Sequence, residues 1–285
     1  MKKLLFQLDT DIHPAVFDTV VGYDGGADQV IGHGGLTPET VGALVEGCIF
    51  TRAPKDKKNT AIFVGGSDLG DGQKLFKAVQ KMFFADFRVS VMLDSNGSNT
   101  TAAAGVAKMG TSGSLTGKRA VILAGTGPVG QRAAVMLANE GAEVSLTSRQ
   151  MPRAVAACEA MQDRFSVQLT PVEANTNDAR GLAIENAQIV FATGAAGAQL
   201  LNTHHWANNP HIEIMADANA TPPLGIEGTE MMDKGAHRNG KIMWGAIGFG
   251  TLKLALHRAC IARMFESNDL LLDAEEIYAT AKAMA

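Results

Sequence analysis

Short apolar runs alternate with amphipathic stretches along the first part of the chain. The runs are rich in Leu, Val, Ile and Phe, and they end close to Asp or Gly, a pattern typical of strands buried in a parallel sheet. The stretches between them carry apolar residues at helical spacing. We expect strands at 4–8, 28–31, 61–64 and 89–93, and helices at 14–24, 38–50, 73–84 and 102–109, with Thr37 and Pro38 as the cap and first position of the second helix.

The same alternation continues after a Gly/Ser/Thr-rich segment at 110–117. The pattern predicts strands at 118–125, 143–149, 166–173, 188–194 and 212–219, with helices at 127–142, 152–165 and 177–187. A last helix near the carboxyl end follows no predicted strand. The sequence therefore predicts an α/β protein of two domains, each a mostly parallel sheet with helices on both faces, the second of Rossmann type. We expect these domains at 1–112 and 113–269, with the helix in 270–285 packing back on the first.

Composition and charge exclude several classes of protein. The 285 residues include 25 Lys and Arg against 29 Asp and Glu, a net charge of −4, and no basic block suggests a nucleic-acid partner. Cys48, Cys158 and Cys260 form no C-x-x-C pair, so we expect reduced, buried thiols in a cytoplasmic protein. No apolar run reaches the roughly 18 residues of a membrane span. The 31 glycines point to tight turns and close approaches of backbone to a ligand.

A glycine-rich segment stands between a predicted strand and a predicted helix, and it fits the pattern G-x-G-x-x-G. In that context Gly125 permits the tight turn, Gly127 lets the backbone approach a pyrophosphate, and Gly130 allows helix and strand to pack closely. The amino end of the helix then binds the phosphates. The segment predicts a dinucleotide site formed by Gly125, Thr126, Gly127, Pro128, Val129 and Gly130.

The end of the next predicted strand indicates which dinucleotide binds. An NAD enzyme usually carries Asp or Glu there, whereas this chain has Ser148 and Arg149, followed by Arg153. A guanidinium group matches a 2′-phosphate through its planar fork, and a serine can add a hydrogen bond. The sequence therefore favours NADP over NAD. Further cofactor contacts are expected at the ends of later strands, from Thr193, Gly194, Ala195, Ala246, Ile247 and Gly248.

Two other segments suggest a substrate site. Small hydrogen-bonding side chains gather at a strand end and helix start, and they suit a polar heterocycle, although helix capping explains some of them. The residues concerned are Asn96, Gly97, Ser98, Asn99, Thr100 and Thr101, and we add Asp217 and Asn219 at the end of a later strand. Lys253 is expected in the first turn of a helix capped by Thr251, where it opposes the helix dipole. His204 and His205 are adjacent and should diverge, so a zinc enzyme is not expected.

Several long segments carry a resemblance to a known family: LLFQLDTD, VFDTVVGYDGGAD, LDSNGSNTTAAAGVA, LAGTGPVG, NATPPLGI, LKLALHRACIA and LDAEEIY. In these segments, from end to end, the chain resembles the NADP-dependent methylene-tetrahydromethanopterin dehydrogenases of methylotrophic bacteria. The resemblance implies a tetrahydromethanopterin-type substrate, with tetrahydrofolate as a second carrier, and a homo-oligomer such as a trimer. It also implies that Lys253 is the catalytic lysine and that Asp18 is a catalytic acidic residue.

Three other functions remain open at this stage. The first is a bifunctional methylene-tetrahydrofolate dehydrogenase/cyclohydrolase, although the chain lacks the Tyr-x-x-x-Lys signature of those enzymes. The second is a shikimate- or quinate-type dehydrogenase, which shares the two-domain layout and would need a Lys–Asp pair beside a hydroxyl group. The third is an NADP-binding sensor without catalytic activity.

Overall fold

The computed structural model describes residues 1–285 and divides them into two compact units. Unit 1 comprises residues 1–100, 254–280 and 284; unit 2 comprises 101–253, 281–283 and 285. The division falls inside three helices, at 100/101, at 253/254 and between residues 280 and 284, whereas the sequence suggested boundaries in the loops at 112/113 and 269/270. None of the helices is long and apolar enough to pass through a membrane.

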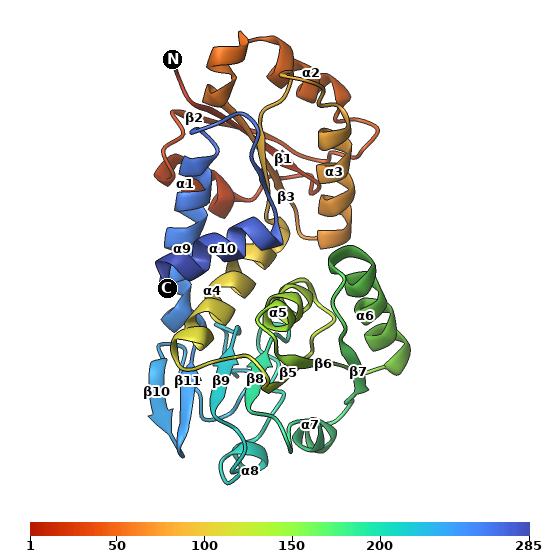
Figure 1. Cartoon of the computed structure of the whole chain (residues 1–285), viewed down its shortest axis with the longest axis vertical. Helices are drawn as coiled ribbons and strands as arrows, with labels where there is room; N and C mark the ends of the chain where they lie inside the picture. The colour runs from red at the N-terminus through yellow and green to blue at the C-terminus, as the bar shows by residue number, and fades with distance from the viewer. The chain divides into compact units, whose positions relative to one another are not determined.

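Unit 1 contains a five-stranded, wholly parallel sheet with the strand order β12-β4-β3-β1-β2. Its core strand β3 is buried at every position, as expected of a strand covered on both faces. The elements are β1 (Leu4–Asp9), α1 (Val16–Asp24), β2 (Gln29–His33), α2 (Gly42–Phe50), the 3₁₀ helix η1 (Pro54–Asn59), β3 (Thr60–Gly65), α3 (Leu69–Lys81), β4 (Ser90–Leu93), the 3₁₀ helix η2 (Ser95–Gly97), β12 (Leu271–Leu272) and α10 (Ala274–Met284) (Figure 1).

Different helices cover the two faces of this sheet. On one face, apolar residues of α2 and α3 join alternate residues of the strands in one buried cluster that includes Val45, Leu75 and Ile62. On the other face, the ring of Phe63 in β3 stacks on His257, with their centroids 5.4 Å apart. The alternation of Ile62 and Phe63 between the two faces follows from the pleat of the strand.

Unit 2 contains a seven-stranded sheet in the order β10-β11-β9-β8-β5-β6-β7. All neighbours pair in parallel except β10 and β11, which form an antiparallel hairpin at the edge. The six parallel strands have the order of a dinucleotide-binding Rossmann sheet. The elements are β5 (Arg119–Leu123), α5 (Pro128–Asn139), β6 (Glu143–Ser148), α6 (Met151–Phe165), β7 (Thr170–Glu173), α7 (Asn177–Ala183), β8 (Ile189–Ala192), α8 (Thr203–Trp206), β9 (Ile214–Asp217), β10 (Lys234–Arg238) and β11 (Lys241–Trp244).

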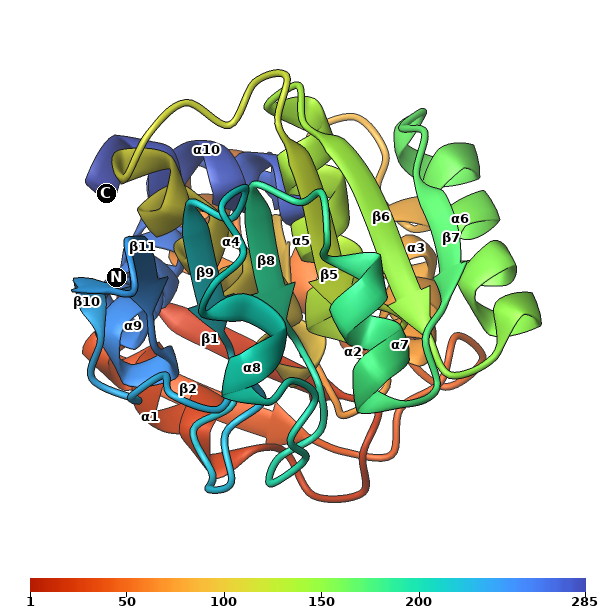
Figure 2. The same cartoon turned by 90° about the horizontal axis from the view of Figure 1, so that it is seen from below.

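Helices cover both faces of the unit 2 sheet as well. Helices α5 and α6 lie on one face, and α7 and α8 lie on the other (Figure 2). Helices α4 (Ser98–Thr111) and α9 (Ala246–Arg263) cross the division between the units, as do the last residues of α10. The two-sheet α/β architecture predicted from the sequence is confirmed.

Three local predictions are wrong, and one pair of strands was not predicted. Helix α2 begins at Gly42 and not at Pro38, because residues 37–41 form a turn in which the amide groups of Thr40 and Val41 donate to the Thr37 carbonyl. The segment before the last helix does form a strand, β12, which pairs with β4. The hairpin of β10 and β11 was not predicted because β10 is largely polar and β11 has only three consecutive apolar residues. Helix α9 begins seven residues before Lys253, in a segment whose Gly248 and Gly250 suggested a loop.

Candidate active site

The glycine-rich turn joins β5 to α5 at the carboxyl edge of the unit 2 sheet. A Cβ atom on Gly130 would lie 2.6 Å from the Cα atom and the carbonyl oxygen of Gly125, so only glycine allows α5 to pack this closely. At Gly127, by contrast, a Cβ atom would meet nothing within 4 Å, which leaves open space beside the backbone. The side chain of Gln131 donates to the Thr126 carbonyl at 2.7 Å and holds the turn. These are two of the three glycine environments that a dinucleotide turn requires.

A pocket of about 300 Å³ opens beside this turn. The structure brings six of the predicted cofactor residues to it: Thr126, Ser148, Arg149, Arg153, Gly194 and Ala195. Seven further residues of its wall were not predicted: Ala124, Thr147, Ala174, Arg180, Ala198, Gln199 and Leu200. The strands β5, β6, β7 and β8 all end near this pocket, so the parallel order of the sheet brings the residues together.

The charge of the pocket is positive. Arg149, Arg153 and Arg180 line it, and no Asp or Glu does. Arg149 and Arg153 are exposed, whereas Arg180 is only 8% exposed. Burial, together with the nearby charge of Arg149, lowers the pKa of Arg180 from its ordinary value. Arg180 could have been found from the sequence, because it follows β7, which lies next to β6, and β6 ends in Ser148.

The remaining predicted cofactor residues lie at the same carboxyl edge without lining this pocket. The hydroxyl group of Thr193 donates to the Leu123 carbonyl at 3.0 Å and joins the ends of β8 and β5. Ala246, Ile247 and Gly248 form the first turn of α9, directly after β11. A Cβ atom on Gly248 would lie 1.7 Å from the Asp233 carbonyl oxygen, so this glycine is required for packing.

Asp217 and Asn219, predicted to contact substrate, are both buried and serve the loop after β9. The Asp217 carboxylate accepts hydrogen bonds from the amide groups of Asn219 and Ile226, at 2.9 Å and 2.8 Å. The Asn219 side chain accepts from the amide of Thr221 and donates to the Pro223 carbonyl. Burial raises the pKa of Asp217 to about 6. These contacts give both residues a structural role.

The polar segment after β4 is organised around a buried carboxylate in unit 1. Asp94 accepts hydrogen bonds from the amide groups of Asn99 and Thr100 and from the Thr100 hydroxyl group, at 2.8, 3.1 and 2.6 Å. Of the predicted substrate residues, Ser98, Asn99 and Thr100 are buried, while Asn96 is exposed. Capping of α4 thus accounts for Asn99 and Thr100, and Asn96, Gly97 and Thr101 retain accessible surface.

The two predicted catalytic residues belong to different units. Asp18 lies on α1 of unit 1 and is 9% exposed. Lys253 lies on α9 and is half-buried, at the edge of unit 2. Its expected place in the first turn of a helix capped by Thr251 is wrong, because α9 already begins at Ala246. The helix dipole acts mainly within the first turn, so it gives no reason for a special state of Lys253.

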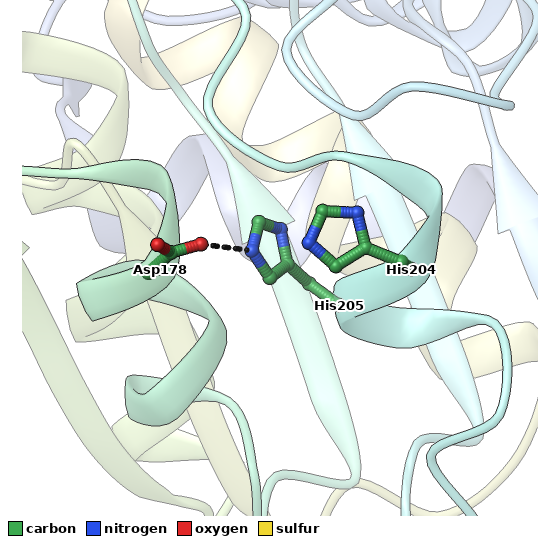
Figure 3. Close-up of side chains that lie close together, drawn as sticks. All are labelled: Asp178, His204 and His205. Atoms are coloured by element: carbon green, nitrogen blue, oxygen red, sulfur yellow. Dashed lines mark hydrogen bonds and ion pairs between the residues drawn. The ribbon is translucent and has the colours of Figure 1, made fainter.

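The expectation that His204 and His205 diverge is also wrong. Their ring centroids lie 4.0 Å apart, and Asp178 of α7 completes a cluster whose potential ligand atoms are all within 4.8 Å of one another (Figure 3). The Nδ1 atom of His205 accepts a hydrogen bond from the Asn202 amide, which places the ring proton on Nε2. That Nε2 atom donates to Asp178 at 3.0 Å. In this arrangement His205 links α8 to α7 and has no free nitrogen for a metal.

The Rossmann strand order, the glycine turn and the basic pocket together define the class of NAD(P)-dependent dehydrogenases. Residues 16–96 match the family described as methylene-tetrahydromethanopterin dehydrogenase, N-terminal. The chain is 56% identical over 286 residues to the "Bifunctional protein MdtA" of Methylorubrum extorquens, covering 100% of this chain and 99% of that protein. It therefore belongs to the methylene-tetrahydromethanopterin dehydrogenase family, which confirms the resemblance seen in the sequence.

Two further comparisons agree with this assignment. The chain is 30% identical over 294 residues to the NAD(P)-dependent methylenetetrahydromethanopterin dehydrogenase of the same organism, covering 100% of this chain and 99% of that protein. Its fold is similar to that of the shikimate 5-dehydrogenase from Listeria monocytogenes, with a TM-score of 0.54, 12% identity, and coverage of 98% and 96% of the two chains. This second likeness concerns the fold alone. The family makes the chain an oxidoreductase and does not favour the alternative functions.

Asp217 gives a prediction about stability and pH. Its carboxyl group has a pKa of about 6 when folded and an ordinary value of 3.8, so the folded state retains a proton that the unfolded state releases between these values. The resulting stabilisation is fully present below pH 3.8 and is lost as the pH rises through 6. Between pH 7 and pH 5, the free energy of unfolding of the wild type should gain about 1 kcal/mol relative to Asp217→Asn. Urea unfolding of both proteins at the two pH values measures this gain. An equal change in the free energy of unfolding of both proteins would contradict it.

Proposed function

We propose that the protein catalyses the reversible, NADP-dependent dehydrogenation of methylene-tetrahydromethanopterin to its methenyl cation, with methylene-tetrahydrofolate as a second substrate. The proposal rests on family membership and on one observation, the basic pocket where Ser148, Arg149 and Arg153 gather without a carboxylate. An NAD site would place Asp or Glu at the end of β6 to bind the ribose hydroxyl groups. Arginine side chains suit a 2′-phosphate instead.

The residues of the glycine turn fit the pyrophosphate of this cofactor. The open space at Gly127 allows the backbone to approach the phosphates, and the amino end of α5, which begins at Pro128, would bind them. Ser148 and the two exposed arginines would hold the 2′-phosphate, with Thr193, Gly194 and Ala195 under the ribose and nicotinamide. NADP, when bound, supplies the nicotinamide ring that accepts the hydride.

The hydride transfer requires little or no proton transfer by the protein. The two nitrogen atoms beside the methylene carbon stabilise the cation that forms, so the step requires no general base. The protein contributes by holding the reacting carbon atoms in contact. In this proposal the Asp18 carboxylate favours the cation electrostatically, whereas Lys253 donates hydrogen bonds to the pterin or its tail. An ammonium group close to the reacting carbon would oppose the developing positive charge.

The cofactor preference and the reaction can be tested together by following absorbance at 340 nm with methylene-tetrahydromethanopterin. We expect kcat/KM with NADP to exceed that with NAD by at least about 10-fold, a difference of about 1.4 kcal/mol. Equal values would contradict the role of Arg149 while leaving the reaction intact. No reduction with either cofactor, in protein shown to be folded, would favour a sensor or a shikimate-type activity. Formation of a formyl product would reveal a cyclohydrolase.

The role of Lys253 predicts a selective loss in Lys253→Ala. Removal of a hydrogen bond from a charged donor should lower kcat/KM for the methylene pterin by about 10- to 100-fold and leave the dissociation constant of NADP unchanged. Lys77→Ala, which removes an exposed lysine from α3, is the matched control and should behave as the wild type. Normal turnover and normal substrate affinity in Lys253→Ala would disprove the role.

The cytoplasmic location and the homo-oligomer implied by the family resemblance remain predictions.

A further inference from the structure

Arg180 is a buried cation without an anionic partner. Its side chain extends from α7 and is 8% exposed. Its Nη1 atom donates to the side-chain oxygen of Asn177 and to the Leu200 carbonyl, the latter at 3.1 Å. Both acceptors are neutral, and Arg180 forms no ion pair. A buried guanidinium group is costly unless a counter-charge compensates it.

The neighbours of Arg180 in the pocket increase this cost. Arg149 and Arg153 line the same pocket of about 300 Å³, and neither forms an ion pair. Burial, and after it the repulsion from Arg149, lowers the pKa of Arg180. Three guanidinium groups therefore surround one cavity, and nothing in the protein balances their charge. A bound anion would balance it.

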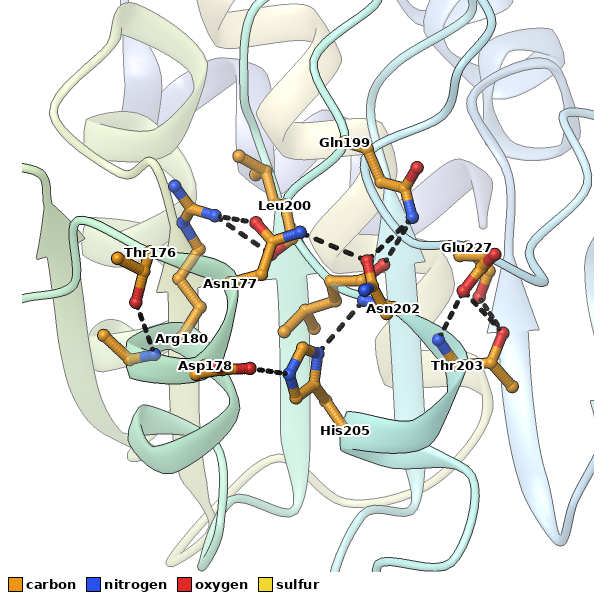
Figure 4. Close-up of polar contacts among 12 residues, drawn as sticks. Thr176, Asn177, Asp178, Arg180, Gln199, Leu200, Asn202, Thr203, His205 and Glu227 are labelled. Atoms are coloured by element: carbon orange, nitrogen blue, oxygen red, sulfur yellow. Dashed lines mark hydrogen bonds and ion pairs between the residues drawn. The ribbon is translucent and has the colours of Figure 1, made fainter.

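A chain of hydrogen bonds fixes the position of the Arg180 side chain (Figure 4). The Asn177 side chain accepts from Arg180 and donates to the side-chain oxygen of Asn202 at 3.1 Å. Gln199 donates to the same oxygen at 3.0 Å. The amide of Asn202 donates to His205, which in turn donates to Asp178 on the same helix as Arg180.

This chain returns to α7, where Asn177, Asp178 and Arg180 all lie, and so it ties that helix to the loop that forms one wall of the pocket. Such a fixed guanidinium loses little conformational entropy when it binds an anion. The polar residues on the far side of Arg180 thereby have a purpose beyond packing.

We infer that Arg180 is a third cationic contact of the 2′-phosphate of NADP, placed deeper in the pocket than Arg149 and Arg153 and held ready by the Asn177–Asn202–His205–Asp178 chain. The inference rests on the proposed function, because it assumes that the pocket receives NADP. It assigns to Arg180 a share of the preference for NADP over NAD, which the segment at the end of β6 alone would otherwise carry. Arg180 has no role in the reaction itself.

The test uses two small ligands that differ only in the phosphate group, 2′,5′-ADP and 5′-AMP, with isothermal titration calorimetry of the full chain. In Arg180→Met the dissociation constant of 2′,5′-ADP should rise by about 10- to 100-fold, as expected for a lost charged hydrogen bond, while that of 5′-AMP changes by less than about 3-fold. Arg119→Met is the matched control, because Arg119 is exposed at the opposite, amino end of β5. It should bind both ligands as the wild type does.

Every other outcome of this experiment contradicts the inference. If both ligands weaken equally in Arg180→Met, the residue contacts the adenine or supports the pocket, and the inference is wrong. If neither weakens, it is wrong as well. If the wild type does not distinguish the two ligands, the proposed NADP site fails, and the inference fails with it.

A second variant covers the case in which Arg180→Met does not fold. Arg180→Lys retains a positive charge but loses the planar fork, so it should weaken 2′,5′-ADP less than the methionine variant and leave 5′-AMP unchanged. An unchanged ratio of the two dissociation constants in Arg180→Lys would overturn the inference.

Discussion

The close contact between Gly130 and Gly125 is the constraint on which the rest of the cofactor site depends. It sets α5 directly against the end of β5, with no room for a Cβ atom at Gly130. The amino end of α5 then points out of the carboxyl edge of the sheet, where the neighbouring strand β6 also ends. Because all the central strands are parallel, their last residues reach the same edge, and a single pocket collects side chains from four of them.

Charge decides what this pocket accepts. Three arginines and a serine line it without any carboxylate, and one arginine is almost fully buried. Hydrogen bonds to neutral groups position Arg180 but cannot compensate its charge. The pocket thus holds positive charge that a phosphate group would balance, and in the function proposed above this basic pocket, more than the glycine turn, selects NADP over NAD. The family of methylene-tetrahydromethanopterin dehydrogenases supplies the reaction that this site serves.

The sequence predicted what local patterns encode and missed what long-range packing decides. The glycine turn and Arg149 follow from short motifs with a known mechanism, and the strands from apolar runs. Arg180 was not predicted, because its role depends on the pocket that forms only when β7 and β8 pack around it. Lys253 was placed wrongly because Gly248 and Gly250 suggested a loop, whereas close packing against the Asp233 carbonyl requires Gly248 inside a helix. Asp217 was predicted to contact substrate because it stands at a strand end. The sequence alone could not show that its carboxylate accepts hydrogen bonds from the following loop.

The most direct test of this account is the affinity of the unmodified protein for NADP and for NAD, measured at low and at high salt. If phosphate pairing with the arginines sets the preference, NADP should bind far more tightly than NAD at low salt. The difference between the two affinities should decrease as salt screens the exposed arginines, and the part that the buried Arg180 contributes should remain. Equal affinities at low salt, or a gap that salt does not alter, would contradict the claim that unbalanced positive charge in the pocket selects the cofactor.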